Sequence, residues 1–168
     1  MIKVIVFTFV VTVFIVLIAN TVTSRSNLPS VYSSVTRNPS DFVVANIDQC
    51  NTVLRACVYK FSDVGIEDAL VRAMQRGVQV YIIADAEENK GPKKTMTKLK
   101  GLGAHVYLWN ASKLHAKFVI YDDKVVTLGS NNWSKNSGTS NMEIMMRVSD
   151  CATVQQFVDI FNTLLKKL

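Results

Sequence analysis

Short apolar segments alternate with helical repeats between residues 52 and 109, and this alternation constrains the fold more than any other feature. The segments TVLRACVYKF, VQVYIIA and AHVYLW have the β-branched and aromatic composition of buried strands. Between the first two, apolar residues recur at helical spacing over residues 65–77, and Gly77 stands where a helix is capped. Strand, helix, strand, helix, strand predicts a largely parallel sheet with helices on both faces.

The flanking parts of the chain add elements to this unit. A short strand is expected near residues 30–35, and a helix is expected to start at Asn38 and Pro39. In the C-terminal half, LHAKFVIYD and KVVTLGS predict a hairpin, and MEIMMRVS predicts one more strand. Residues 150–168 have the apolar spacing of an amphipathic helix. The sequence therefore predicts an α/β sandwich with a mixed, largely parallel sheet.

The N-terminal segment is not expected to be part of the globular domain. Residues 4–22 contain no charged side chain, and as a helix they extend about 28 Å. Two interpretations compete, a membrane anchor and a secretory signal peptide, and the length favours the anchor because signal peptides have shorter apolar stretches. We expect residues 1–24 to form this hydrophobic helix, residues 25–29 to be a linker, and residues 30–168 to form a single domain.

The composition favours a globular, basic protein. With 49% hydrophobic residues the chain has enough apolar material for a core, which excludes a disordered tail or a fibre. Nineteen Lys and Arg against thirteen Asp and Glu leave a net charge of +6, which favours polyanionic partners. Residues 90–100 hold several lysines and no acid. Their lysines are candidate nucleic-acid contacts, although a solvated loop and short helix explain them equally well: Lys90, Lys93, Lys94 and Lys98.

The cysteines and one histidine offer no recognisable metal site. Cys50, Cys57 and Cys151 form no CxxC pair, so no zinc-ligand pattern is present. We expect them to be buried thiols; if the chain is exported, one pair forming a disulfide stays open. His105 has no lysine two residues later and is expected to be structural.

A group of polar residues near residues 113–143 has the chemistry of a phosphate site. His115 is suited to act as a nucleophile or an acid/base near neutral pH, and Lys117 supplies a cation for phosphate oxygens. A glycine after a strand allows close backbone approach, neutral donors follow it, and an acid is available to orient the imidazole. The residues with these roles are Gly129, Ser130, Asn132 and Glu143, and Asp122 ends the first hairpin strand.

This spacing resembles a known family. The pattern HxKxxxxD, followed after six residues by GSxN, is present as His115, Lys117, Asp122, Gly129, Ser130 and Asn132. It is similar to the HKD motif of the phospholipase D superfamily. The resemblance extends over most of residues 30–168 and implies the α/β sandwich of that superfamily.

The resemblance implies how the site works. Members of the superfamily build one active site from two HKD motifs, form a covalent phosphohistidine with one histidine, and protonate the leaving group with the other. No metal or other cofactor is required. This chain contains one such motif, which implies half an active site and a homodimer that brings two copies together. In this reading His115, Lys117, Asp122 and Glu143 are catalytic, and Lys117, Ser130 and Asn132 bind phosphate, although the place of Asp122 at a strand end favours a supporting role.

Small single-motif members resemble two kinds of enzyme. One is the compact bacterial endonuclease, exported or periplasmic; the other is the membrane-anchored Zucchini or mitochondrial phospholipase D type, linked to small-RNA processing and cardiolipin hydrolysis. The basic balance favours a nuclease for DNA or RNA, whereas the segment 4–22 favours a lipase held at a membrane, for example on mitochondria. No Cys and His zinc cluster of the Zucchini sort is present, so the nuclease is preferred. A silent nucleic-acid-binding or tethering protein ranks last.

Overall fold

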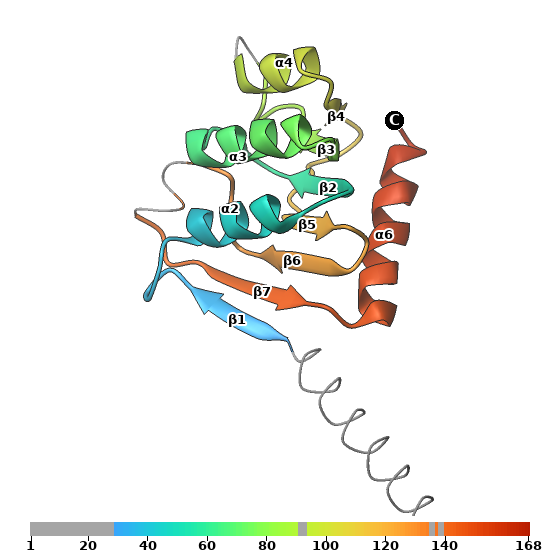
Figure 1. Cartoon of the computed structure of the whole chain (residues 1–168). Helices are drawn as coiled ribbons and strands as arrows, with labels where there is room; N and C mark the ends of the chain where they lie inside the picture. Colours follow the sequence, from blue (N-terminus) through green and yellow to red (C-terminus); the bar gives the residue numbers. More distant parts are fainter. Residues whose placement is uncertain (1–28, 91–93, 135–136, 138–139) are drawn as a thin grey trace, which may run out of the picture.

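The computed structural model describes residues 29–168, except residues 91–93, 135–136 and 138–139 (Figure 1). Eleven elements are described in this part of the chain. Their order along the chain is β1 (Ser30–Ser33), α2 (Pro39–Gln49), β2 (Val53–Val58), α3 (Val64–Gln75), β3 (Gln79–Asp85), α4 (Lys94–Gly101), β4 (His105–Trp109), β5 (Phe118–Tyr121), β6 (Val125–Gly129), β7 (Ile144–Val148) and α6 (Cys151–Leu165).

The seven strands form one mixed sheet in the order β1-β7-β6-β5-β2-β3-β4. Parallel pairing is limited to β2–β3 and β3–β4, and the other four pairs are antiparallel. The predicted α/β class and mixed sheet are confirmed, but the sheet is less parallel than the sequence indicates. The physical reason is that only β2–β3 and β3–β4 are joined by helical crossovers, through α3 and α4, which parallel pairing requires. The consecutive strands β5, β6 and β7 pair antiparallel, and β1 pairs antiparallel with β7 at the edge.

Helices cover both faces of the sheet, but unequally (Figure 1). On one face α2, α3 and α4 bury a large cluster that includes Ile47, Leu70 and Leu99. On the other face α6 alone packs on the sheet, through Val158 and Phe161 and their apolar neighbours. One helix cannot cover seven strands, so parts of this second face stay open.

Local signals explain the boundaries of the first helices. The Asn38 side chain accepts a hydrogen bond from Ser40 N (3.0 Å), and Pro39 occupies the first helical turn, as predicted for the start of α2. After α3 the backbone of Gly77 adopts φ +90°, a conformation that favours glycine, and its N–H donates to Met74 O. These contacts are local, which is why the sequence predicts them.

Some predictions fall partly or wholly outside the described residues. The hydrophobic helix over 1–24, the linker over 25–29 and Lys93 belong to this group, apart from residue 29 of the linker. In residues 29–168, leaving out the three short gaps, no helix combines the length and apolarity needed to cross a bilayer.

The cysteines are all free thiols. Cys50 and Cys57 are buried, as predicted, and burial raises their pKa values to about 11 and about 12. Cys151 is exposed, so its predicted burial is wrong. It is the first residue of α6, a helix that turns only one side towards the sheet.

The hairpin turn between β5 and β6 is tied to the loop after α2. Asp122 and Asp123 both adopt left-handed backbone conformations, with φ 53° and 51°, as the predicted two-residue turn requires. The Asp122 carboxylate accepts hydrogen bonds from the backbone N–H groups of residues 51–53 and from the Thr52 hydroxyl (2.8 Å). Burial by itself would raise its pKa, but the hydrogen bonds from Thr52 and Asn51 hold the pKa of Asp122 well below its usual range.

We predict that Asp122→Asn lowers the free energy of unfolding by about 2 kcal/mol at pH 7, because it weakens several charge-assisted hydrogen bonds while Asn tolerates the same turn. A depressed folded-state pKa stabilises the protein above the unfolded value of about 3.9, and that contribution is lost as pH falls below it. The difference between variant and wild type should therefore shrink between about pH 5 and pH 3. Urea unfolding of the full chain in mild detergent measures it, and a pH-independent difference would contradict the assignment.

Candidate active site

Most residues of the predicted phosphate site lie at one end of the sheet. Tyr59 directly follows β2, and Asp85 ends β3. Because β5 and β7 run antiparallel to β2 and β6, the residues before β5 and β7 lie at this same end. Lys117 and Glu143 hold those positions, and Ser130 directly follows β6. The carboxyl ends of parallel strands are where α/β sheets commonly bind ligands.

Residues 113–117 cross this end of the sheet instead of extending β5, which begins at Phe118. The prediction of a strand running from residue 114 is therefore wrong for its first part. The buried Asp85 carboxylate accepts a hydrogen bond from Leu114 N (2.8 Å) and another from Glu88 N (3.0 Å). The hydrogen bond between Asp85 and Leu114 holds the segment beside the end of β3, outside the β2–β5 pairing. The His115 side chain is exposed there.

A tyrosine that the sequence reading missed organises the basic side chains. The Tyr59 ring packs edge-on against the His115 ring, with centroids 4.7 Å apart. The ammonium groups of Lys117 and Lys113 each lie 5.0 Å from the centre of the same ring. The Tyr59 hydroxyl donates to Glu88 (3.0 Å), which holds the ring in place.

Lys117 is well placed to bind a phosphate. Its ammonium group donates to the His115 carbonyl oxygen (2.8 Å). Burial lowers the pKa of Lys117, the Glu143 carboxylate opposes that effect, and the Lys113 ammonium adds to it. Two cations therefore lie close enough to repel one another beside an exposed imidazole, an arrangement that favours binding of an anion.

Glu143 is buried and bonded, but not to the imidazole. Its carboxylate accepts hydrogen bonds from the Ser130 hydroxyl and from the Asn141 amide (3.2 Å). Its backbone pairs with Ser34, which fixes the start of β7. In the described part of the chain no hydrogen bond joins Glu143 to His115, so the expected orienting contact within one copy is not made.

Gly129 is required by a close backbone approach between β6 and β7. A Cβ atom at this position would lie 2.2 Å from the carbonyl oxygen of Ile144 and 2.8 Å from Met145 Cα. The Ser130 backbone N–H donates to that Ile144 carbonyl (3.0 Å), which places Ser130 beside Glu143. The glycine predicted for close approach thus serves the packing of two strands under the site.

Two asparagines end the motif. Asn132 Oδ1 is buried and has no hydrogen-bond partner within the described residues. Asn131, which the sequence analysis did not select, is 2% exposed, and neither atom of its side-chain amide is paired with a described residue. Asn131 lines a very small cavity together with Lys117. Buried polar atoms are normally paired, so these two amides are exceptions among the described residues near Lys117.

The remaining candidates lie elsewhere. Asp122 follows the opposite end of β5, about 16 Å along the chain from Lys117 at the rise of a strand. The structure thus separates Asp122 from the other candidates, and its contacts give it a structural role. His105, at the start of the edge strand β4, stacks on Tyr81 with ring centroids 4.5 Å apart.

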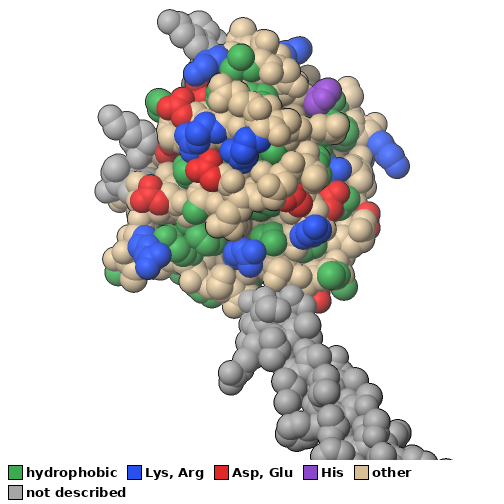
Figure 2. Space-filling view, viewed as in Figure 1, with side chains coloured by type: hydrophobic (Ala, Val, Ile, Leu, Met, Phe, Trp, Pro, Cys, Tyr) green, Lys and Arg blue, Asp and Glu red, His purple; other side chains and the backbone are tan. Residues whose placement is uncertain are grey.

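The lysine cluster does not form a free basic surface in the described residues. Lys90 is paired with Glu87, and Lys98 with Glu67 (2.6 Å). The backbone of Lys94 begins α4. Figure 2 shows that Lys and Arg side chains also lie beside acidic side chains on the face that carries α2 and α3.

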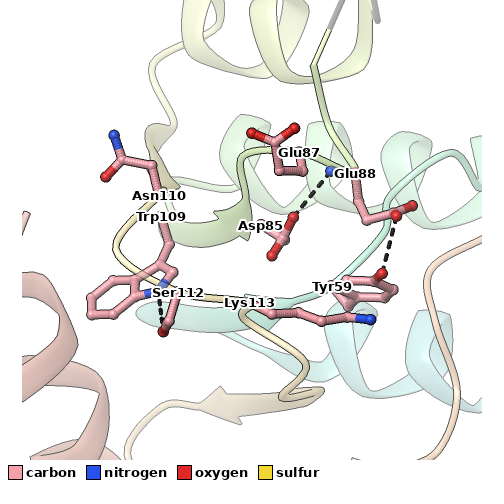
Figure 3. A pocket seen from close by; sticks show the side chains of 8 residues that line it. All are labelled: Tyr59, Asp85, Glu87, Glu88, Trp109, Asn110, Ser112 and Lys113. Atoms are coloured by element: carbon pink, nitrogen blue, oxygen red, sulfur yellow. Dashed lines mark hydrogen bonds between the residues drawn. The ribbon is translucent and has the colours of Figure 1, made fainter.

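A cavity of about 320 Å³ opens beside Tyr59 and Lys113 (Figure 3). Both residues line the cavity, and both also belong to the group around His115, in which the Tyr59 ring contacts the basic side chains. The other lining residues come from the loops after β3 and β4 and from the last residue of each of these strands: Asp85, Glu87, Glu88, Trp109, Asn110 and Ser112. Figure 3 shows the Trp109 ring on one side of the cavity and Tyr59 on the other.

Comparison with known proteins identifies the fold and the family. A family model described as "Cardiolipin synthase, PLD-like domain" matches residues 43–165. The solved structure of Nuc from Salmonella typhimurium, a phospholipase D family member, superposes with a TM-score of 0.77 at 27% identity, covering 83% of this chain and 95% of Nuc. NucT from Helicobacter pylori, at 22% identity and a TM-score of 0.70, shares the fold. The chain belongs to the phospholipase D-like family.

Curated relatives carry the names of hydrolases. Mitochondrial cardiolipin hydrolase of Xenopus laevis is 30% identical over 112 residues, which are 66% of this chain and 53% of that protein. Phospholipase D of Rickettsia prowazekii is 26% identical over 136 residues, covering 80% and 66%. This chain spans about half the length of the cardiolipin hydrolases it matches. The predicted superfamily and the predicted class, a phospholipase D-like hydrolase, are confirmed at the level of the family.

We predict that Gly129→Ala lowers the free energy of unfolding by about 1–3 kcal/mol, because the added methyl group must displace backbone of β7. The same displacement moves Glu143 relative to Ser130. We therefore expect phosphodiesterase activity to fall by more than the loss of folded protein explains. Thermal unfolding and steady-state rates measure the two effects. Gly101→Ala, where an added methyl meets nothing within 4 Å, is the matched control.

Proposed function

We propose that this protein is a phosphodiesterase and acts as a metal-independent endonuclease on DNA, RNA or both. The observation that carries the proposal is the half-site itself. An exposed His115, two lysine ammonium groups and the pair Ser130–Glu143 converge at one end of the sheet. In the phospholipase D-like family, to which the chain belongs, we assign these groups to attack on a phosphodiester.

The proposed reaction has two displacements at phosphorus. The His115 imidazole of one copy attacks, a P–N bond forms, and the P–O bond to the leaving group breaks while His115 of a second copy donates a proton to the departing oxygen. Water then gives its proton to that second imidazole and attacks phosphorus, and the P–N bond breaks. In both steps Lys117 of each copy balances the negative charge on the phosphate oxygens, and the Asn132 amide N–H donates hydrogen bonds to them.

Two observations support a nuclease over a lipase. The net charge of +6 favours a polyanion. The structural match covers 83% of this chain and 95% of Nuc, so the fold of this chain accounts for nearly all of the Nuc chain, whereas it matches only about half of the cardiolipin hydrolases. The lysines at residues 90 and 98 support it less than the sequence indicates, because each is paired with an acid.

We predict that His115→Ala lowers cleavage of single-stranded and duplex DNA and of RNA by at least about 10³-fold, since it removes the nucleophile, while binding of the same substrates is retained. Rates in EDTA and anisotropy of labelled oligonucleotides measure the two properties. His105→Ala is the matched control and should cleave at the wild-type rate. A His115→Ala variant as fast as wild type would exclude the phosphohistidine.

The open part of the α6 face supports a homodimer. Val31 and Met146 are directly paired between β1 and β7 and are 67% and 38% exposed. Ile144 lies two residues before Met146, on the same face, and is 49% exposed. Val148 continues this row and packs with α6, which places the row on the α6 face. An exposed apolar row beside Glu143 is suited to a two-fold contact that brings two half-sites together.

We predict that Met146→Glu converts the dimer to monomers and reduces cleavage at least tenfold, because it puts a charge into the apolar contact. Sedimentation velocity and the cleavage assay are run on the same preparations. Leu102→Glu, an equally drastic change at an exposed apolar residue after α4, should leave both unchanged. A monomeric variant with wild-type activity would contradict the shared site.

Hydrolysis of a membrane phospholipid is the second candidate. It is favoured by the name of the relatives, mitochondrial cardiolipin hydrolase, and by the uncharged segment 4–22. We propose that this segment holds the domain at a membrane, for example on the surface of mitochondria; the alternative is a signal peptide whose cleavage releases a secreted or periplasmic domain. Cardiolipin vesicles in the same EDTA assay decide between the two substrates, and inactivity on all substrates with intact folding would favour a binding or tethering protein.

A further inference from the structure

Lys113 is a second cation of the site, and the HKD pattern does not include it. It lies two residues before His115, as Lys117 lies two residues after it. Both ammonium groups are 5.0 Å from the centre of the Tyr59 ring, which also contacts the His115 ring. One aromatic ring thus holds three basic side chains at the end of the sheet.

The Lys113 charge is not balanced by an ion pair. Lys60, Lys90 and Lys98 each reach a carboxylate, at Glu88, Glu87 and Glu67 respectively. Among the residues that the structure describes, no carboxylate oxygen lies within 4.0 Å of the Lys113 ammonium. Besides burial, the Lys113 ammonium lowers the pKa of Lys117, so the two positive charges repel each other in the free protein, and a bound anion relieves that repulsion.

The cavity beside Lys113 has the right chemistry for a nucleoside. Its volume of about 320 Å³ lies in the range of small-molecule sites, and the aromatic rings of Trp109 and Tyr59 line it (Figure 3). The Asn110 amide and the Glu87 carboxylate offer acceptors for the amino groups of a base. Glu87 pairs with Lys90, and Glu88 accepts from the Tyr59 hydroxyl, so neither acid is placed on Lys113. The carboxylates disfavour a phosphate inside the cavity and leave Lys113 at its border as the phosphate contact.

We propose that Lys113 binds the phosphate next to the scissile one in a nucleic-acid strand, and that the cavity receives the nucleoside between the two phosphates. This inference rests on the proposed nuclease function and deepens it. Lys117 contacts the phosphate under attack and Lys113 contacts the neighbouring one, so the site binds two consecutive phosphates of one strand. A substrate with a single phosphodiester gains little from Lys113.

The test compares two substrates in the full-length protein. Lys113→Ala should lower kcat/KM on a single-stranded oligonucleotide about tenfold, mainly through KM, and reduce the slope of binding against salt by about one phosphate contact. The loss on a dinucleoside monophosphate, which has one phosphodiester, should be less than threefold. Lys113→Arg, which keeps the charge, should recover most of the oligonucleotide activity.

Lys124→Ala is the matched control, because it removes one exposed lysine at the opposite end of the sheet. This variant should leave kcat/KM unchanged on both substrates. Equal losses on both substrates in Lys113→Ala, or no loss on either, would overturn the proposal, as would a loss confined to cardiolipin vesicles. If the wild type cuts no nucleic acid but still shows Lys113-dependent salt sensitivity of binding, the nuclease function fails and the phosphate contact stands; if it neither cuts nor binds, both fail.

Discussion

The site depends on the hydrogen bonds of one buried carboxylate, that of Asp85. It is 3% exposed and accepts from the backbone of Leu114 and of Glu88. Through Leu114 it holds the segment with His115 across the end of the sheet, and through Glu88 it shapes the loop that holds Tyr59. A buried acid is stable only when it is bonded in this way, so the end of β3 and the loops around it are ordered together.

The two ends of β5 have different tasks. At its start, the exposed His115 and the Lys117 ammonium contact the Tyr59 ring, and the side-chain amide oxygen of Asn132 has no partner among the described residues. At its end the Asp122 carboxylate is saturated with backbone donors from the loop before β2. Saturation makes a turn rigid, whereas unpaired polar groups keep their capacity for a ligand. The sequence offers both Asp122 and Glu143 as site acids. Their contacts assign Asp122 to the scaffold and place Glu143 beside Ser130 at the site end of the sheet.

The distribution of charge follows the same division. Several basic side chains on the helical face have acidic partners, for example Arg72 with Asp48 and Lys98 with Glu67. Such exposed pairs add little stability, but they neutralise the surface locally. Among the described residues, neither Lys113 nor Lys117 forms an ion pair, and both ammonium groups contact the Tyr59 ring. An overall charge of +6 therefore matters less for binding than the place where the charge stays uncompensated.

The sequence by itself determined the elements and their order, because strand composition, helical periodicity and caps such as Asn38 and Gly77 act over a few residues. It also identified the family through the spacing from His115 to Asn132. Tertiary structure alone decided that Tyr59, Asp85 and Lys113 lie beside His115, that Asp122 lies at the other end of β5, and that most strand pairs are antiparallel. These facts follow from contacts between residues far apart in the chain, 56 positions for Tyr59 and His115, and no local pattern encodes which distant strands become neighbours.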